Sequence, residues 1–510
     1  MCQCQRVLFC IMVWINKTTF WYWTVVGILL GVGFVVPVLW VLGLVGGAGF
    51  LFLLNKSQSK KSLFLGALWA WTIKYLFAIS WFWSTYPIEW LPVELDKAQL
   101  LVIFVYWSTT AFWLGLGALP MVGLFLLGKK YFKNEQLKFW LLLPLVWLSG
   151  EILGAYIFSI ISMGEGGIIT SAFSFGYSGY LLVEHNLLSL FGNFYGVYGL
   201  SFLFALLSLF IIKFVKSVSS SYRYTLGILL ASLSLTSGVQ FVAGEARFSE
   251  HYKILIIDTH FPINSLRNRQ DDTLVKDELA LAMGFALEYE PDYIVLPEDS
   301  RFFNQSKDPS LEKSFFQFQY NHPKTIIVDS GPISVDGSGI LQAFVYDGLN
   351  NKYYQPQKNY LVPQGEFMPY LSTKIFRLLG YSEIMDSLSS KISFDVGKNK
   401  TQSDLEKEVP GVLFCFESVS PFGVRKLLNE RPNMPFVAHP VSHAWFHESE
   451  VLWNQLDSML KIQAMWNDSY IVSAGNHVSG RVVIPNGQMK TPQTIRRGEF
   501  WEIKEILIPK

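Results

Sequence analysis

The first half of this chain consists largely of apolar runs that are too long for the helices of a soluble domain. A helix needs about 20 mostly apolar residues to cross a bilayer. Seven stretches before residue 243 meet or approach this length, and they cover residues 20–36, 37–54, 63–84, 100–127, 137–159, 195–215 and 224–242. We therefore predict a polytopic α-helical membrane domain of about seven helices over residues 1–243, and a separate domain over residues 244–510.

Charge separates the two parts and predicts their orientation. Residues 1–243 contain 14 Lys and Arg and 7 Asp and Glu, whereas residues 244–510 contain 27 and 33. Basic side chains gather in alternate loops of the first part, at Lys56, Lys60, Lys61, Lys129, Lys130, Lys133, Lys138, Lys213, Lys216 and Arg223. The positive-inside rule then predicts a multi-pass membrane protein with a cytoplasmic N-terminus, and the odd number of spans puts residues 244–510 on the extracytoplasmic side, in the periplasm or at the cell exterior.

Several classes of function find no support in the sequence. The net charge of +1 gives no indication of a nucleic-acid partner, and no phosphate-binding or dinucleotide-binding glycine motif is found. Cys2, Cys4 and Cys10 precede a short apolar stretch without a signal-peptide cleavage pattern, and Met12 is an alternative start. A metal or lipid site at Cys2 and Cys4 is the less favoured interpretation, so we predict no metal and no cofactor.

The second half alternates between β-rich runs and helical patterns, which is typical of a layered α/β fold. The expected strands are 253–258, 293–297, 325–329, 341–346, 412–416, 435–438, 470–473 and 481–484. The expected helices lie near 270–290, 309–320, 419–429 and 449–467. The Ser-, Lys-, Asp- and Glu-rich stretch 383–408 is predicted to be a mobile surface insertion, either a lid or an inert loop.

Three side chains at the predicted ends of strands suggest acyl-transfer chemistry. Cys415 is the single cysteine of the second half and precedes an expected helix start at 418–421, where backbone N–H groups favour a thiolate. Glu298 follows an apolar strand, and an apolar wall raises a carboxyl pKa toward the range of a general base. Lys358 lies between Pro-containing segments, and a fixed ammonium suits an oxyanion. Glu366 and Glu417 are candidates to orient the lysine and the nucleophile strand.

Each of these residues also has a plainer interpretation. A lone buried cysteine is more often a small core residue than a nucleophile. A Glu that follows Pro at a strand end is often a turn residue, and a Lys near Pro is often solvated. It is the order Glu298, Lys358, Cys415 with these flanking residues that favours catalysis.

These residues carry a resemblance to the nitrilase, or carbon–nitrogen hydrolase, superfamily, and most closely to its membrane branch, the apolipoprotein N-acyltransferases. The resemblance extends to Leu361-Val362-Pro363, Gly365-Glu366, Phe416-Glu417 and Ala444-Trp445-Phe446, and in the first half to Trp147, Glu151, the run 175–178 and the run 196–202. It implies an αββα sandwich in the second half, with Glu298, Lys358 and Cys415 as the catalytic residues. The predicted fold class is thus a polytopic α-helical membrane domain plus an α/β nitrilase-like αββα sandwich domain.

The resemblance also implies a reaction. Cys415 takes a fatty acyl chain from a phospholipid donor as a thioester and passes it to the N-terminal amine of a diacylglyceryl prolipoprotein. Glu298 transfers the protons, while Lys358 and backbone donors hold the oxyanion. Trp445 and Phe446 wall the acyl pocket or belong to the core. A membrane-tethered amidase that uses water and an inactive nitrilase-like binding domain are the alternatives.

The chain departs from the family pattern in several places. Arg267-Asn268 stands where the family has Lys-Trp, Phe416 replaces a tyrosine, and Leu296 replaces a tryptophan before Pro-Glu. The family's last membrane span is not seen at the C-terminal end.

Polar residues outside the three catalytic candidates receive weaker interpretations. His439, His443 and His447 are expected at a pocket mouth or a polar surface rather than around a metal. Lys74 and Glu151 lie within apolar spans, where a charge is costly, and this suggests a function for each. Snorkelling or an internal polar contact is the alternative for both, and we favour it for Lys74.

Overall fold

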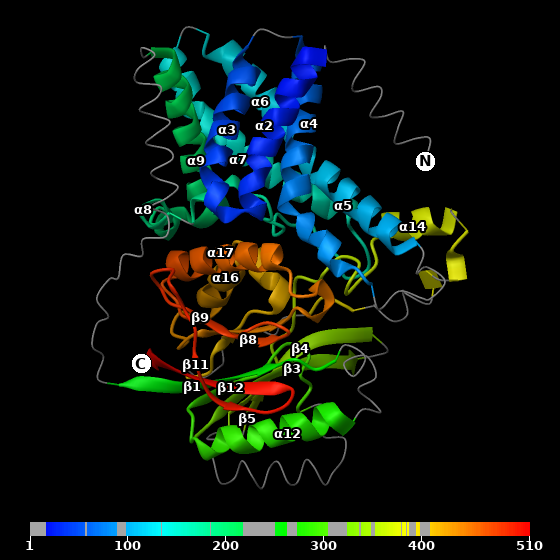
Figure 1. Ribbon diagram of the computed structural model, residues 1–510, viewed down its shortest axis with the longest axis vertical. Coiled ribbons are helices and arrows are strands. Elements are labelled where there is room, and N and C mark those ends of the chain that lie inside the picture. The colour runs from blue at the N-terminus through cyan, green and yellow to red at the C-terminus, as the bar shows by residue number, and fades with distance from the viewer. Residues whose placement is uncertain are drawn as a thin grey trace. The chain divides into compact units, whose positions relative to one another are not determined.

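Two groups of elements make up the computed structural model (Figure 1). The structure describes residues 17–56, 59–88, 98–133, 135–183, 185–217, 250–262, 273–303, 324–335, 338–347, 352–378, 380–383, 385–386, 394–397 and 408–510. By their internal contacts, Met1–Ile161, Ile169–Val242 and Ser449–Ile462 form a helical unit. Ser162–Ile168, Ala243–Glu448 and Gln463–Lys510 form an α/β unit. The predicted boundary at 243/244 stays a prediction, because residues 218–249 lie outside the described part.

The helical unit is built from apolar helices. They are α2 (Lys17–Val35), α3 (Trp40–Asn55), α4 (Lys60–Ala78), α5 (Gln99–Gly115), α6 (Ala118–Tyr131), α7 (Gln136–Ile161), α8 (Asn186–Ser189) and α9 (Gly192–Ser217), with 3-10 turns at Pro37–Leu39, Ser80–Thr85 and Ser178–Leu182. Within the described residues, four stretches are long and apolar enough to cross a membrane: Pro37–Asn55, Gln99–Tyr131, Lys138–Ile161 and Gly192–Val215. Phe20–Val35 is shorter, and the predicted span 224–242 lies outside the described residues.

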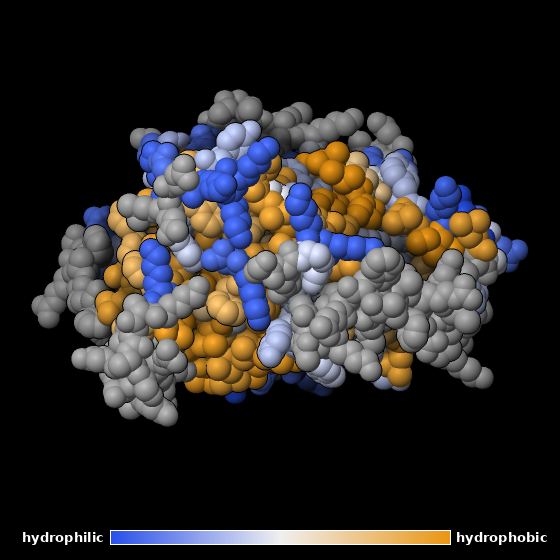
Figure 2. Space-filling model, turned by 90° about the horizontal axis from the view of Figure 1, so that it is seen from above, coloured by the Kyte–Doolittle hydropathy of each residue, from blue (hydrophilic) through white to orange (hydrophobic). Residues whose placement is uncertain are grey.

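Large apolar side chains on these helices face outward. The exposed ones include Trp21, Leu101, Leu141, Leu145, Ile160 and Phe210. Seen along the helices, hydrophilic side chains gather in clusters on a face that is otherwise largely hydrophobic (Figure 2). Soluble monomers rarely expose so much contiguous apolar surface, so these outer faces fit a lipid environment.

Two of the predicted spans differ in detail from the structure. The run 100–127 is not one helix, because α5 ends at Gly115 and α6 begins at Ala118. At this break Gly117 lies directly against the carbonyl of Gly150, so a side chain there would collide with α7. The run 63–84 is a helix only as far as Ala78 and then continues as a 3-10 turn. Close backbone approach of this kind leaves no periodic signal in the sequence.

Lys74 and Glu151 form an ion pair inside the helical unit, and neither side chain is exposed. Lys74 Nζ lies 2.8 Å from Glu151 Oε1, which also accepts hydrogen bonds from the backbone N–H and the hydroxyl of Ser178 at 2.8 and 2.7 Å. Lys74 therefore makes the internal polar contact considered for it and does not snorkel. Glu151 joins α4 and α7 to the 3-10 turn that begins at Ser178.

The α/β unit contains a twelve-stranded mixed sheet in two halves. The strands are β1 (His251–Thr259), β2 (Tyr293–Val295), β3 (Ile326–Val335), β4 (Ser338–Asp347), β5 (Lys352–Tyr354), β6 (Gly411–Val412), β7 (Val437–Ser442), β8 (Ile471–Asn476), β9 (Arg481–Val483), β10 (Met489–Lys490), β11 (Gln493–Arg497) and β12 (Trp501–Pro509). The helices are α12 (Thr273–Glu288), α14 (Tyr370–Leu378), α16 (Gly423–Glu430) and α17 (Glu450–Asn467), whose first part groups with the helical unit.

The two sheet halves pack face to face. A single pair, Thr259 and Asn476, joins β1 to β8. Ile254 and Ile256 of β1 lie in one buried cluster with Ala438 of β7 and Val472 of β8, so this cluster is the centre of the unit. The alternate side chains of β1 pack against α12, which lies along one outer face, while α16 lies on the other side of the sheets (Figure 1). The predicted fold class is confirmed, with apolar helices in the first part and an α/β domain in the second.

The eight predicted strands all occur, although 412–416 pairs only at Gly411 and Val412. The helix predicted at 309–320 and most of the stretch 383–408 lie outside the described residues. Sequence analysis missed β12, which pairs antiparallel with β1 over its whole length. Lys504 of β12 donates to Asp258 of β1 at 2.7 Å in the interior. The candidate site residues Glu298, Lys358 and Cys415 follow the ends of β2, β5 and β6.

We expect replacement of Glu151 by Leu to destabilise the protein by about 3–5 kcal/mol, because it leaves the Lys74 ammonium buried without a carboxylate. The double variant Lys74→Met/Glu151→Leu should lose less stability than Glu151→Leu alone. Thermal unfolding in detergent checks both. Equal losses in the two variants would contradict a coupled buried pair.

Candidate active site

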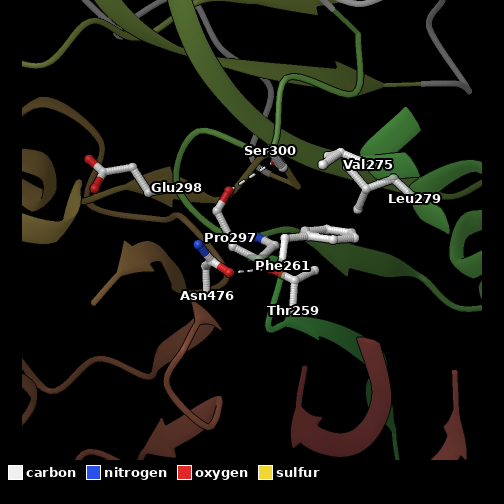
Figure 3. Close-up of a pocket in the computed structure, with 8 residues that line it drawn as sticks. All are labelled: Thr259, Phe261, Val275, Leu279, Pro297, Glu298, Ser300 and Asn476. Atoms are coloured by element: carbon white, nitrogen blue, oxygen red, sulfur yellow. Dashed lines mark hydrogen bonds between the residues drawn. The ribbon is translucent and has the colours of Figure 1, made fainter. Parts of the chain in front are cut away.

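Glu298 lies just beyond the end of β2. The N–H of Leu296 still bonds the carbonyl of Val328 at 2.9 Å, so Pro297 and Glu298 are the first residues to leave the sheet. A small cavity beside this loop is lined by Thr259, Phe261, Val275, Leu279, Pro297, Glu298, Ser300 and Asn476. Figure 3 shows the Glu298 carboxylate pointing away from Val275 and Leu279. The carboxylate therefore lies on the opposite side of the loop from this cavity wall.

Lys358 is held between two carboxylates. Its Nζ lies 2.9 Å from Glu298 Oε1 and 2.6 Å from Glu366 Oε1, and its side chain is 1 % exposed. The backbone of Lys358 is fixed as well, because its N–H bonds the carbonyl of Leu341 at 2.8 Å and its carbonyl accepts from Gly397 at 3.0 Å. The ammonium is fixed as the sequence predicts, and it joins Glu298 to Glu366.

Burial and charge set the protonation states of this pair. Burial raises the pKa of Glu298 to about 7, against the opposing effect of the Lys358 ammonium. Burial acts to lower the pKa of Lys358, but the carboxylates of Glu298 and Glu366 outweigh it and raise that pKa. The lysine therefore stays cationic, while Glu298 changes its protonation state near neutral pH.

Cys415 opens a short 3-10 helix, Cys415–Val419, directly after the β6 segment. The residue as a whole is partly exposed, and its Sγ lies 3.9 Å from the carbonyl oxygen of Ser442. Burial raises the pKa of this thiol, the Glu298 carboxylate raises it further, and Lys358 lowers it. The predicted thiolate at a helix N-terminus is not supported, because α16 begins only at Gly423 and burial dominates. The resting group is a thiol that needs a base.

Glu417 ties the lysine segment to the nucleophile turn. Its Oε1 accepts from the N–H groups of Asn359 and Tyr360 at 2.7 and 3.2 Å, and its Oε2 accepts from the N–H of Phe414 at 3.2 Å. One carboxylate thus fixes the residues that follow Lys358 and the residue that precedes Cys415.

Glu366 has a comparable double function. Its Oε2 accepts from the N–H of Val362 at 2.8 Å while its Oε1 meets Lys358. The geometry agrees with the orienting function predicted for Glu366 and Glu417. Their contribution to a reaction stays a prediction.

The aromatic candidates lie in two places. Phe416 stacks on Tyr360 with ring centroids 5.0 Å apart, so it packs over the lysine segment. Trp445 and Phe446 belong to the 3-10 turn Ala444–Phe446 and are half-buried, and Phe446 meets the His443 ring edge-on. Their place in an acyl pocket stays a prediction.

The histidine prediction was wrong in part. His439 and His443 are buried in and after β7, and only His447 is exposed. His439 contacts Ser473 Oγ at 2.9 Å and the carbonyl of Cys415 at 3.5 Å. Burial lowers the pKa of His439 to about 4 and that of His443 to about 3, so both rings are neutral near pH 7. Successive residues of β7 are buried on both faces of the strand, so the spacing of the histidines did not reveal their burial.

Asp329 is a site-supporting residue that sequence reasoning missed. It is fully buried at the end of the predicted strand 325–329, and it accepts hydrogen bonds from Ser300 Oγ and from the N–H of Phe303. Burial raises its pKa to about 6. Asp329 thereby anchors the turn that follows Glu298. An acidic residue inside an apolar strand run is the signal that could have identified it.

The chain is similar to known proteins over about half its length. It is 25 % identical over 244 residues to apolipoprotein N-acyltransferase of Aquifex aeolicus, and the match covers 47 % of this chain and 51 % of that relative. This similarity confirms the resemblance predicted from the motifs. The chain thus matches only about half the length of this curated relative. No family model matches the chain.

The solved structures that the chain matches include an amidase and a carbon–nitrogen hydrolase. The NitN amidase from Neterenkonia sp. AN1 has 15 % identity and a TM-score of 0.34, with 50 % of this chain and 93 % of that chain covered. A carbon–nitrogen hydrolase from Helicobacter pylori G27 has 10 % identity and a TM-score of 0.33, with 50 % and 88 % covered.

The pKa of Glu298 predicts a pH profile for the thiol. Below about pH 7 the carboxyl is protonated and unable to accept the proton of Cys415, so the rate of Cys415 alkylation should rise with pH through a midpoint near 7. Iodoacetamide labelling of the Cys2→Ser/Cys4→Ser/Cys10→Ser protein, in which Cys415 is the one cysteine, followed by intact-mass spectrometry measures this rate. Glu298→Gln should lower the rate at pH 7.5 and remove the midpoint. An unchanged profile in that variant would exclude Glu298 as the base.

Glu417→Gln should weaken the hydrogen bonds that hold the segment after Lys358 and the residue before Cys415. The new amide NH2 faces a backbone N–H donor, so about 1–3 kcal/mol of stability is lost. Thermal unfolding and the rate of Cys415 alkylation check this together. The partly exposed Glu430→Gln in α16 is a matched control that should change neither.

Proposed function

We propose that this chain is a membrane-embedded acyltransferase that moves a fatty acyl chain from a phospholipid to the N-terminal amine of a diacylglyceryl-cysteine lipoprotein. The observation that carries the proposal is the Lys358 ammonium fixed between Glu298 and Glu366, beside the protonated thiol of Cys415. The similarity to a protein named apolipoprotein N-acyltransferase supports the substrate class.

The first half-reaction loads the thiol. The Glu298 carboxylate takes the Cys415 proton as Sγ attacks the ester carbonyl carbon of the phospholipid. Among the described contacts, two of the three Lys358 N–H donors engage carboxylates, and the third is left for the oxyanion. Collapse of the tetrahedral intermediate breaks the ester C–O bond. The leaving lysophospholipid oxygen takes the proton from Glu298, and a thioester remains on Cys415.

The second half-reaction forms the amide. The lipoprotein amine attacks the thioester carbonyl, and Glu298 accepts a proton from the nitrogen. Collapse breaks the C–S bond, and the Glu298 proton returns to the Cys415 sulfur. A carboxyl whose pKa lies near 7 suits both directions, because it gains and loses a proton with little cost near neutral pH.

The apolar helices give the reaction its location. Both substrates are lipids, and helices with exposed Leu, Ile, Phe and Trp side chains hold the chain where lipids arrive laterally. The basic loops Lys56–Lys61 and Lys129–Lys138 put the N-terminus in the cytoplasm by the positive-inside rule. In this proposal the α/β domain works on the periplasmic side of the cytoplasmic membrane.

Intact-mass spectrometry of the detergent-purified protein after incubation with phospholipid tests the proposal. We expect one added fatty-acyl mass that a diacylglyceryl-cysteine peptide removes, with formation of the N-acyl peptide. Cys415→Ala should show no adduct. The triple variant Cys2→Ser/Cys4→Ser/Cys10→Ser should still show it.

Other outcomes would replace the proposal. An adduct that water discharges as fast as the lipopeptide would indicate a hydrolase. A folded protein that takes up no acyl chain from any phospholipid mixture, while Cys415 remains open to alkylation, would overturn the acyltransferase assignment.

A further inference from the structure

Seven residues from the loop after α7 group with the α/β unit. Ser162–Ile168 directly follow the long apolar helix that ends at Ile161. The N–H of Tyr370 bonds the carbonyl of Met163 at 2.8 Å, and Gly164 forms an antiparallel bridge with Pro369. The segment thus forms one isolated β-bridge and one further backbone hydrogen bond beside the residues that follow Glu366.

Three glycines let this segment approach closely. A Cβ on Gly164 would collide with the carbonyl of Met368 and would lie 2.9 Å from the Phe367 ring. Gly166 has φ +87°, a backbone conformation that is strained for residues with a side chain. A Cβ added there would lie 2.5 Å from the Phe394 carbonyl oxygen. Gly167 would place a Cβ 3.1 Å from the Phe367 ring. A larger residue at any of these positions has to push the neighbouring backbone or ring away.

The neighbours of these glycines hold Glu366. The N–H of Phe394 bonds the carbonyl of Glu366 at 3.0 Å, and the carbonyl of Phe367 accepts from Gln364 at 2.8 Å. Leu361, whose Cδ1 lies 3.1 Å from the Cβ position of Gly166, is buried together with Phe367. The turn that carries Glu366 is therefore packed between the glycine segment and Phe394. Since Glu366 bonds Lys358, a shift of this turn moves the ammonium.

We propose that Ser162–Ile168 is a positioning element for the Lys358–Glu366 loop, so that a loop from the apolar half of the chain sets the geometry of the ammonium–carboxylate pair. The Glu366 turn has little regular structure of its own, and the glycine segment supplies backbone hydrogen bonds and a close-packed surface that fix it. Its consequence for turnover rests on the acyl-transfer function proposed above. Its effect on the site geometry does not.

The test uses Gly164→Ala and Gly166→Ala in the full-length protein. Each should displace the Glu366 turn and with it Lys358 and Glu298, so Cys415 alkylation at pH 7.5 should slow by about tenfold. The midpoint of the pH profile should move above about 7, because the ammonium lowers the pKa of Glu298 and burial then raises that pKa unopposed. Loading of the acyl chain should slow in parallel.

Matched controls separate positioning from general damage. Glu165→Gln changes an exposed residue of the same segment, and Gly284→Ala adds a Cβ in α12 where no atom lies within 4 Å. Both should keep the wild-type alkylation rate and pH midpoint. Should an alanine variant fail to fold, Phe367→Leu trims the ring that covers Gly164 and Gly167 without imposing a clash, and it should slow alkylation by about two- to fivefold.

Two results would overturn the proposal. One is a folded Gly164→Ala or Gly166→Ala protein with the wild-type rate and pH midpoint. The other is a loss of thermal stability in Phe367→Leu without any change in the alkylation profile, which would indicate a structural function alone. If the wild-type protein takes up no acyl chain, the acyl-transfer function fails while the alkylation comparison still decides the positioning proposal.

Discussion

The placement of one ammonium group governs the chemistry of the α/β unit. Lys358 Nζ lies 2.9 Å from Glu298 Oε1 and 2.6 Å from Glu366 Oε1, and the lysine side chain is 1 % exposed. Two carboxylates against one ammonium leave the group with excess negative charge, and burial penalises that charge. The result is a Glu298 whose pKa is about 7 and a lysine that stays cationic. In the proposed reaction, the proton acceptor and the oxyanion donor both come from this one contact.

Two further carboxylates, those of Glu417 and Asp329, hold the segments that carry Lys358, Cys415 and Glu298. Glu417 binds the amides of Asn359 and Phe414, so the lysine segment and the nucleophile turn move together. Asp329 anchors the turn after Glu298. Carboxylates are well suited to this purpose because each oxygen accepts several N–H donors, and a fully satisfied buried carboxylate fixes the surrounding backbone. The site is therefore held by polar contacts to irregular backbone rather than by regular strands.

Strand positions could be predicted from the sequence better than the contacts that support the candidate site. Strand runs such as 253–258 are apolar and bounded by turn residues, so their positions could be read directly. β12 escaped because its alternating Glu and Lys residues resemble a solvated end, and its partner β1 is more than two hundred residues away. The burial of His439, the break near Gly117 and the glycine approach at 164–167 depend on tertiary contacts. Such contacts leave no periodic pattern in one sequence.

Two buried lysine–carboxylate pairs show how similar sequence signals lead to different chemistry. In the helical unit, Glu151 Oε1 receives Lys74 and both donors of Ser178, and the Lys74 ammonium also faces the rings of Trp71 and Tyr75. Each strong contact there joins helices to the turn at Ser178, so the pair organises the unit. In the α/β unit a second carboxylate competes for the same ammonium, and the thiol of the partly exposed Cys415 lies within its electrostatic reach. Glu151 lies inside an apolar run and Glu298 directly follows one, so the two carboxylates look similar in the sequence. The second carboxylate and the neighbouring thiol are what distinguish the Lys358 contact from the Lys74–Glu151 pair.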